Sequence, residues 1–140
     1  MDVKLQALAE AVESFAYLAN VDITALSAML DPRLIDGLQN GKAQKFEYTL
    51  ELCWKTVKSF IKQYEGIDEA SPKRVVKAFY LPGHIAEDEY LELMQAVDDR
   101  NKLSHIYEKR EFDLIIARLP RYAGILQRVL DVMRQTASRP

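Results

Sequence analysis

Residues 43–64 read AQKFEYTLELCWKTVKSFIKQY, and this stretch carries the clearest structural signal in the chain. Its apolar side chains recur at steps of three and four residues, as they do on one face of an α-helix. Lysines lie mostly off that face, and Gly66 follows where a helix can end. We therefore predict a long amphipathic helix, with Phe46 and Trp54 in the core rather than in a ligand site. The apolar face consists of Phe46, Leu50, Cys53, Trp54, Val57, Phe60 and Ile61.

Three further segments repeat apolar residues at the same spacing: residues 3–19, residues 87–97 and residues 111–135. The last segment contains Pro120, which removes a backbone hydrogen bond, so we expect a kink there. No segment shows the alternating pattern of a β-strand. These four helices predict an all-α fold, most simply an up-and-down four-helix bundle with one or two short extra helices.

The connections are marked by turn-forming residue pairs. Asp31-Pro32 and Asp36-Gly37 read as turns after a short helix over residues 24–30. Ser71-Pro72 predicts the start of a second short helix, because serine is a favoured cap and proline is tolerated in a first helical turn.

Length and composition limit the class of protein. The chain has 140 residues, enough for one domain with a single core, and 49% of them are hydrophobic, which excludes a disordered chain. We expect one domain over residues 1–135 and a frayed tail over residues 136–140. The single cysteine, Cys53, is expected to be buried. The lack of disulfides, of an apolar run of about 18 residues and of a signal-peptide pattern predicts a cytoplasmic location.

Charge is unevenly distributed along the chain. Residues 1–99 carry 10 basic and 17 acidic groups, a net charge of −7, whereas residues 100–140 carry 9 basic and 4 acidic groups, a net charge of +5. The overall net charge of −2 argues against a general nucleic-acid binder. Two interpretations stay open: ordinary decoration of helix surfaces, or a local positive field around an anionic ligand or an acidic partner.

The positive segment begins with the run Arg-Asn-Lys-Leu-Ser-His at residues 100–105, and Tyr107 follows. Arg100 presents a planar fork that suits phosphate oxygens, and His105 can transfer protons near neutral pH. The two lie about 140° apart around a straight helix, so they can share a site only through a kink or a symmetric dimer. Alternatively, both are cations that offset the dipole at a helix end. The other histidine, His84, is expected to be a solvated loop residue without a role.

Two segments together resemble a known family. Residues 44–58, QKFEYTLELCWKTVK, resemble the signature helix of the nucleotidyltransferase substrate-binding proteins. Residues 98–107, DDRNKLSHIY, resemble the second signature of the same family. These proteins belong to the HEPN superfamily and are similar to HepT toxins. The order and separation of the two segments fit the family, and the likeness is weakest in residues 20–40.

The resemblance implies a HEPN four-helix bundle, usually a homodimer, encoded beside a minimal nucleotidyltransferase. It also implies a metal-independent ribonuclease site at the dimer cleft. There Arg100 would stabilise the phosphate, His105 would act as acid or base, and Asn101 would support them. Tyr107 would be the residue that the partner enzyme adenylylates to silence the toxin. No cofactor and no metal is expected, because the sequence has no spaced cluster of His, Cys and Asp ligands.

Two functions stay open on the sequence. The first is a HepT-like ribonuclease toxin of the MntA/HepT type, which cleaves RNA and is neutralised by its nucleotidyltransferase partner. The second is a non-catalytic subunit that docks on the nucleotidyltransferase and helps to hold its substrate. The chain lacks a Gly-Ser pair followed by paired aspartates in strand context, so it is not the transferase itself. A third interpretation is a helical dimer that binds no ligand.

Overall fold

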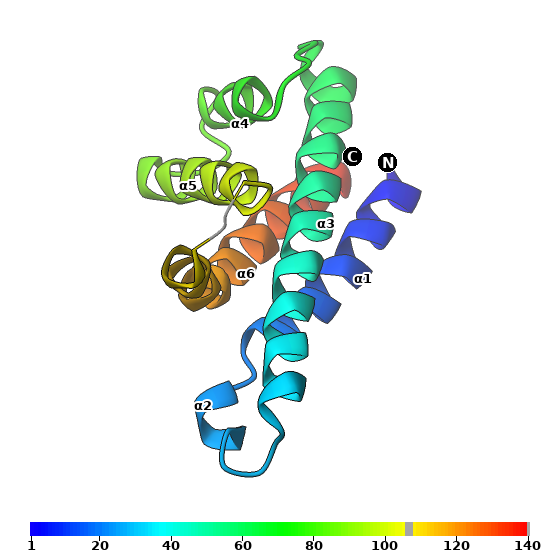
Figure 1. Ribbon diagram of the computed structural model, residues 1–140. Coiled ribbons are helices and arrows are strands. Elements are labelled where there is room, and N and C mark those ends of the chain that lie inside the picture. Colours follow the sequence, from blue (N-terminus) through cyan, green and yellow to red (C-terminus); the bar gives the residue numbers. More distant parts are fainter. Residues whose placement is uncertain (106–107, 140) are drawn as a thin grey trace.

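All regular structure in the computed structural model, which describes residues 1–105 and 108–139, is helical (Figure 1). The predicted all-α fold is confirmed. Four long helices form the bundle, and two short helices lie in the connections. In chain order the helices are α1 (Asp2–Ala19), α2 (Ile23–Leu26), α3 (Pro32–Glu65), α4 (Pro72–Tyr80), α5 (Glu87–Leu103) and α6 (Lys109–Ala137).

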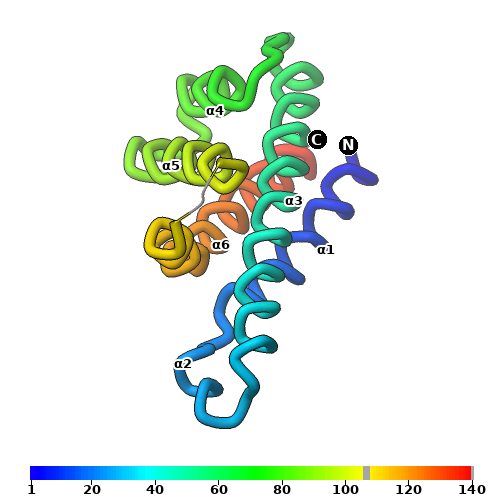
Figure 2. The backbone as a smooth tube through the Cα atoms, in the orientation of Figure 1, coloured from blue at the N-terminus to red at the C-terminus, as the bar shows by residue number. Residues whose placement is uncertain are grey.

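In the smooth trace of Figure 2, α1 and α3 run in opposite directions, whereas α5 lies across α3. Helices α1 and α3 are joined near both ends, where Lys4 Nζ donates to Ser59 Oγ over 2.6 Å and Lys45 Nζ donates to Ser14 Oγ over 2.7 Å. Helices α5 and α6 are likewise antiparallel, because residues early in α5 contact residues late in α6. The pairs α1–α3 and α5–α6 are therefore antiparallel, whereas α3 and α6 run in the same direction, because their first parts line one pocket and their middle parts stack ring on ring.

A single hydrophobic cluster fills the space between α1, α3, α5 and α6, and α4 adds its own apolar face to it. Phe46 lies at its centre and is fully buried, with its ring 5.8 Å from that of Phe15 and 5.4 Å from that of Tyr122. Burial raises the pKa of the Cys53 thiol to about 12, so this residue is the buried, unreactive cysteine that the sequence predicts. Trp54 is only half-buried and packs at the edge of the core.

Helix α3 begins before the second expected turn, which is a correction to the sequence prediction. Asp31 caps it, accepting from the Arg33 backbone N–H over 2.8 Å, and Pro32 occupies the first turn. Asp36 and Gly37 are therefore helical. The first part of α3 extends with α2 beyond the rest of the bundle in Figure 1.

The other helix ends agree more closely with the prediction. Helix α3 ends at Gly66, whose φ of 67° is the left-handed conformation that glycine adopts without strain. Ile67 N–H then bonds to Ile61 O over 3.2 Å, which completes the cap. Helix α6 continues to Ala137, so Thr136 and Ala137 belong to the helix instead of the expected tail. The kink at Pro120 stays a prediction.

His84 is not the solvated loop residue that the sequence suggests. Its side chain is only 20% exposed, and its Nε2 pairs with the Glu65 carboxylate at the end of α3. Its ring also stacks on Phe79, with 4.9 Å between ring centroids. The turn after α4 is thereby fastened to α3. Within the described ranges, no helix is both long and apolar enough to cross a membrane.

Candidate functional site

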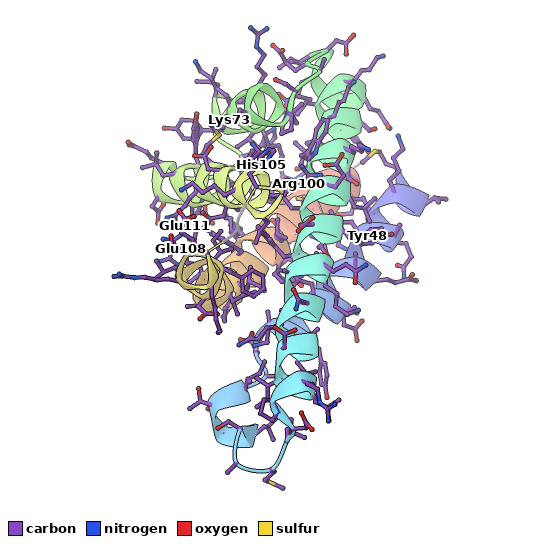
Figure 3. The ribbon with its side chains drawn as sticks, in the orientation of Figure 1. Tyr48, Lys73, Arg100, His105, Glu108 and Glu111 are labelled. Carbon is purple, nitrogen blue, oxygen red and sulfur yellow. The ribbon has the colours of Figure 1, made fainter. Side chains whose placement is uncertain are left out.

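Arg100 and His105 lie at the C-terminal end of α5 (Figure 3), and Asn101 follows Arg100 on the same helix. Three acids, Glu87 to Glu89, begin this helix, and Arg100 and Lys102 lie in its last turn, so both ends complement the helix dipole. The helix ends at Leu103, and His105 follows in a turn, with its backbone N–H bonded to Lys102 O over 2.9 Å. Arg100 and Asn101 are thus on the helix, whereas His105 is just beyond it.

Asp99 fixes this end of α5 on α6. The carboxylate is 1% exposed, and Arg118 Nη1 donates to both of its oxygens, over 2.9 and 3.1 Å. The hydroxyl of Tyr122 donates to the same carboxylate. The hydrogen bond to Asp99 raises the pKa of Arg118, and burial together with Asp99 raises the pKa of Tyr122. This buried network holds the Asp99 side of α5 against α6, and the side chain of Arg100 faces α3.

Arg100 contacts α3 instead of facing open solvent. Its Nη2 lies 2.9 Å from Glu51 Oε2, and each of these side chains is about one-third exposed, 32% and 31%. Its Nε is buried and has no hydrogen-bond partner among residues 1–105 and 108–139. Glu51 therefore binds one nitrogen of the guanidinium fork and leaves the adjacent one unused.

Glu51 accepts from two further groups on its own helix. Trp54 Nε1 donates to Oε2 over 3.0 Å, and Lys55 Nζ lies 3.1 Å from Oε1. Partial burial raises the pKa of the Glu51 carboxyl, but the hydrogen bonds from Trp54 and Lys55 and the charges of Arg100 and Lys55 outweigh burial, so the pKa lies below its ordinary value. The carboxylate is consequently held in its charged form by three donors.

His105 and Asn101 share a shallow hollow of about 450 Å³ on the other side of the helix end. Asp98 and Glu111 also line it, and Lys73 of α4 reaches Asp98 over 2.6 Å. Arg100 does not line this hollow. The structure thus brings His105 and Asn101 together and holds Arg100 against α3, as the angle between their positions on a helix predicts. Tyr107 lies outside the described residues.

The sequence did not predict a role in this region for Glu51 or for the network of Asp99, Arg118 and Tyr122. Glu51 had a weak signal, since it is an acid about one turn before Trp54, which lies at the edge of the apolar face. Asp99 had one as well, because an acid in the last turn of a helix opposes the dipole unless it is paired. Among the residues that the structure describes, no three His, Cys, Asp or Glu side chains come together as metal ligands would.

Comparisons with known proteins identify solved structures that share this fold. A protein of Thermus thermophilus superposes with a TM-score of 0.79 at 28% identity, over 91% of this chain and 98% of that one. HI0074 of Haemophilus influenzae, described as revealing the fold of a substrate binding domain of a nucleotidyltransferase, gives 0.76 at 21% identity, over 94% and 99%. A tri-AMPylated HEPN toxin of Shewanella oneidensis, solved in complex with an MNT antitoxin, gives 0.73 at 14% identity, over 94% of each chain.

The two neighbours below 25% identity support the fold alone. A search of curated proteins finds no significant match. The family model described as "Nucleotidyltransferase substrate binding protein like" matches residues 4–135, which is nearly the whole chain. The resemblance of the two signature segments is therefore confirmed, and the chain belongs to the nucleotidyltransferase substrate-binding protein family.

Proposed function

We propose that this chain is the HepT-like helical partner of a minimal nucleotidyltransferase and a metal-independent ribonuclease, with Arg100 and His105 as its reacting groups. The proposal rests on the arrangement of side chains at the C-terminal end of α5. An exposed histidine lies there beside Asn101, and about one turn earlier comes a half-buried arginine with an N–H that no described residue accepts. The Shewanella neighbour, an HEPN toxin solved with an MNT antitoxin, supports the choice of partner.

The chemistry needs only these side chains and RNA. The 2′-oxygen of RNA attacks the adjacent phosphorus while its proton passes to a base, and the bond from phosphorus to the 5′-oxygen breaks as that oxygen gains a proton. His105 supplies acid or base catalysis in this exchange. Arg100 stabilises the charge that develops on the phosphate oxygens, with a planar fork that suits them.

In this proposal the active site is formed by two copies of the chain. Arg100 and His105 have different surroundings within one chain, so a single copy does not aim both at one phosphate. A twofold dimer through this end of α5 would place each motif opposite its copy across the axis. The second chain would supply the group that the first cannot orient.

Tyr107 is proposed as the site of inactivation by the partner. Its phenol oxygen would attack the α-phosphate of ATP, forming a phosphodiester bond to AMP and releasing pyrophosphate. The added group carries negative charge two residues from His105, where it would repel RNA phosphate. Mass spectrometry of the chain co-expressed with its nucleotidyltransferase should show a mass increase equal to an added AMP group. The Tyr107→Phe variant should not show this increase.

The ribonuclease proposal is tested by comparing wild type with His105→Ala in RNA cleavage and in bacterial growth. Wild type should cleave RNA and slow growth, and the variant should do neither. Co-expression of the nucleotidyltransferase should restore growth. If wild type neither cleaves RNA nor slows growth, the chain is not a toxin of this kind.

A second function, a non-catalytic docking subunit, is favoured by the contact between Arg100 and Glu51. A guanidinium already paired with a carboxylate does not need RNA for its stability. In this alternative the bundle binds the nucleotidyltransferase and helps to hold its substrate. Stable co-purification without ribonuclease activity, unaffected by Arg100→Ala, would select it over the toxin.

A further inference from the structure

The three donors around Glu51 are the kind of groups that bind phosphate. A guanidinium, an ammonium and an indole N–H converge on one carboxylate from two helices. We propose that Arg100, Lys55 and Trp54 form an oxyanion-binding site and that Glu51 occupies it as an internal competitor until a phosphate group displaces it. This inference rests on the proposed function, for which the displacing group is an RNA phosphate, and it makes Glu51 a regulatory residue of the same site.

The geometry shows that Glu51 fits the site incompletely. Arginine presents its Nε and one terminal nitrogen side by side, and two oxygens of one phosphate can accept from both. Nη2 lies 2.9 Å from Glu51 Oε2 in an ion pair, whereas Nε is buried and lacks a partner in the part of the chain that the structure describes. A phosphate that replaced the carboxylate could satisfy both nitrogens. The internal contact is therefore the weaker of the two arrangements for Arg100.

Displacement is feasible because Glu51 lies at the surface. Its side chain is one-third exposed, and Lys55 is more exposed still, so water screens their interaction and can solvate the released carboxylate. Lys55 Nζ also lies 6.0 Å from the centre of the Trp54 ring, which keeps the ammonium beside the site after Glu51 leaves. In this proposal, rotation of the Glu51 side chain frees the three donors.

Trp54 provides a direct readout, because it is the single tryptophan of the chain and its indole bonds to Glu51. Inorganic phosphate is added to the full-length protein at constant ionic strength, and Trp54 emission is followed. Glu51→Gln removes the competing charge and keeps a side-chain oxygen for the indole. Its dissociation constant for phosphate should be lower than that of wild type by about tenfold or more, equivalent to about 1.4 kcal/mol.

Two further variants give the controls. Glu47→Gln removes an acid one turn earlier on the same helix and should leave the phosphate affinity at the wild-type value. Arg100→Ala, placed in the Glu51→Gln background, should abolish the response. Equal phosphate affinities for Glu51→Gln and Glu47→Gln would overturn the inference and leave the Arg100–Glu51 contact as a plain link between α3 and α5.

The shift of the Trp54 indole N–H in NMR spectra of wild type gives a measurement that does not depend on the folding of any Glu51 variant. Phosphate should move this signal, and the movement should be absent in Arg100→Ala; an unmoved signal in wild type up to high phosphate contradicts competition. RNA cleavage separates the two proposals. Competition by phosphate without RNA cleavage would refute the ribonuclease alone, and cleavage without competition would refute only the role of Glu51.

Discussion

Asp99 and Arg100 are neighbours in the chain and have opposite environments. Asp99 faces α6 and is buried, with both carboxylate oxygens bonded to Arg118 and one also to Tyr122. Arg100 faces α3 and is one-third exposed, with one contact to Glu51 and a buried nitrogen left unpaired within residues 1–105 and 108–139.

The difference between these two ion pairs indicates their roles. A buried carboxylate that loses its partners cannot find water in their place, so the Asp99 network is fixed and holds α5 in one orientation. A half-exposed pair can exchange its partner for water or for a ligand at little cost. The buried Asp99 network, called the anchor below, is rigid, whereas the adjacent Arg100–Glu51 pair is exchangeable. The anchor holds α5 so that Arg100 stays beside Glu51.

The largest expected effect is the loss of the anchor. Asp99→Asn removes the buried charge and places an amide against Arg118 and Tyr122, so we expect the free energy of unfolding to fall by about 3–5 kcal/mol. Urea denaturation followed by circular dichroism measures it. The matched control is Asp98→Asn, because both side chains of the Lys73–Asp98 pair are 50% exposed, and it should cost about 1 kcal/mol or less. Equal losses for the two variants would contradict the contrast.

Tyr122→Phe tests the anchor more gently. The ring and its stacking on Phe46 are kept, and only the hydrogen bond to Asp99 is lost, which should cost about 1.5–3 kcal/mol at neutral pH. Burial and Asp99 raise the pKa of Tyr122 in the folded protein. Its contribution is therefore complete below about pH 10, the ordinary value, and is lost as pH rises through the folded pKa.

The same unfolding experiment, repeated from pH 7 into the alkaline range, should show the stabilities of wild type and Tyr122→Phe converging above about pH 10. A constant difference across that range would mean that the phenol is not titrated differently in the folded and unfolded chains.

Glu51→Gln should have a smaller effect on stability, about 1 kcal/mol or less, because the pair with Arg100 is partly exposed. The pKa of Glu51 is lowered in the folded protein. Its stabilising contribution is thus present above the ordinary pKa of a glutamate and is lost as pH falls through the folded pKa. Chemical unfolding at neutral and at acidic pH measures both, and a loss as large as that of Asp99→Asn would show that Glu51 is an anchor as well.

The smallest effect on stability is expected for His105→Ala, which should change the free energy of unfolding by no more than about 0.5 kcal/mol, because the side chain is exposed. Its effect on RNA cleavage should be the opposite extreme, a loss of about 10²- to 10⁴-fold, the usual contribution of acid–base catalysis. Parallel melting curves and cleavage rates test the pair of values. A large loss of unfolding free energy in His105→Ala would instead mean that His105 helps to hold α5 in place.

The long helices could be predicted because their apolar spacing reports burial directly. The start of α3 could not, since Asp36-Gly37 reads as a turn when considered locally. In the structure Lys42 Nζ donates to Val21 O over 2.8 Å and ties the connection before α2 to the helix. Such a contact between distant residues outweighs the local preference, which is about 1 kcal/mol for a glycine in a helix.

The candidate site was predictable only in part. Its residue types and the divergence of Arg100 from His105 follow from the sequence and helix geometry. The partners do not, because Glu51 of α3 meets Arg100 of α5, and Asp99 of α5 meets Arg118 of α6, between helices far apart in the sequence. The prediction that His84 is a solvated loop residue was wrong for the same reason, since its contacts with Glu65 and Phe79 depend on how α4 packs against α3.

The length of α3 also has a consequence for the time scale of motion. The helix has 34 residues, and its buried side chains begin only at Lys42. The first part of the helix, residues 32–41, therefore has little of the buried packing that protects amides, whereas the stretch from Phe46 to Ile61 is expected to open only with the whole core. Amide hydrogen exchange should therefore be fast in the first turns of α3 and slow between Phe46 and Ile61. One helix would then contain both amides that exchange by local opening and amides that exchange only when the core unfolds.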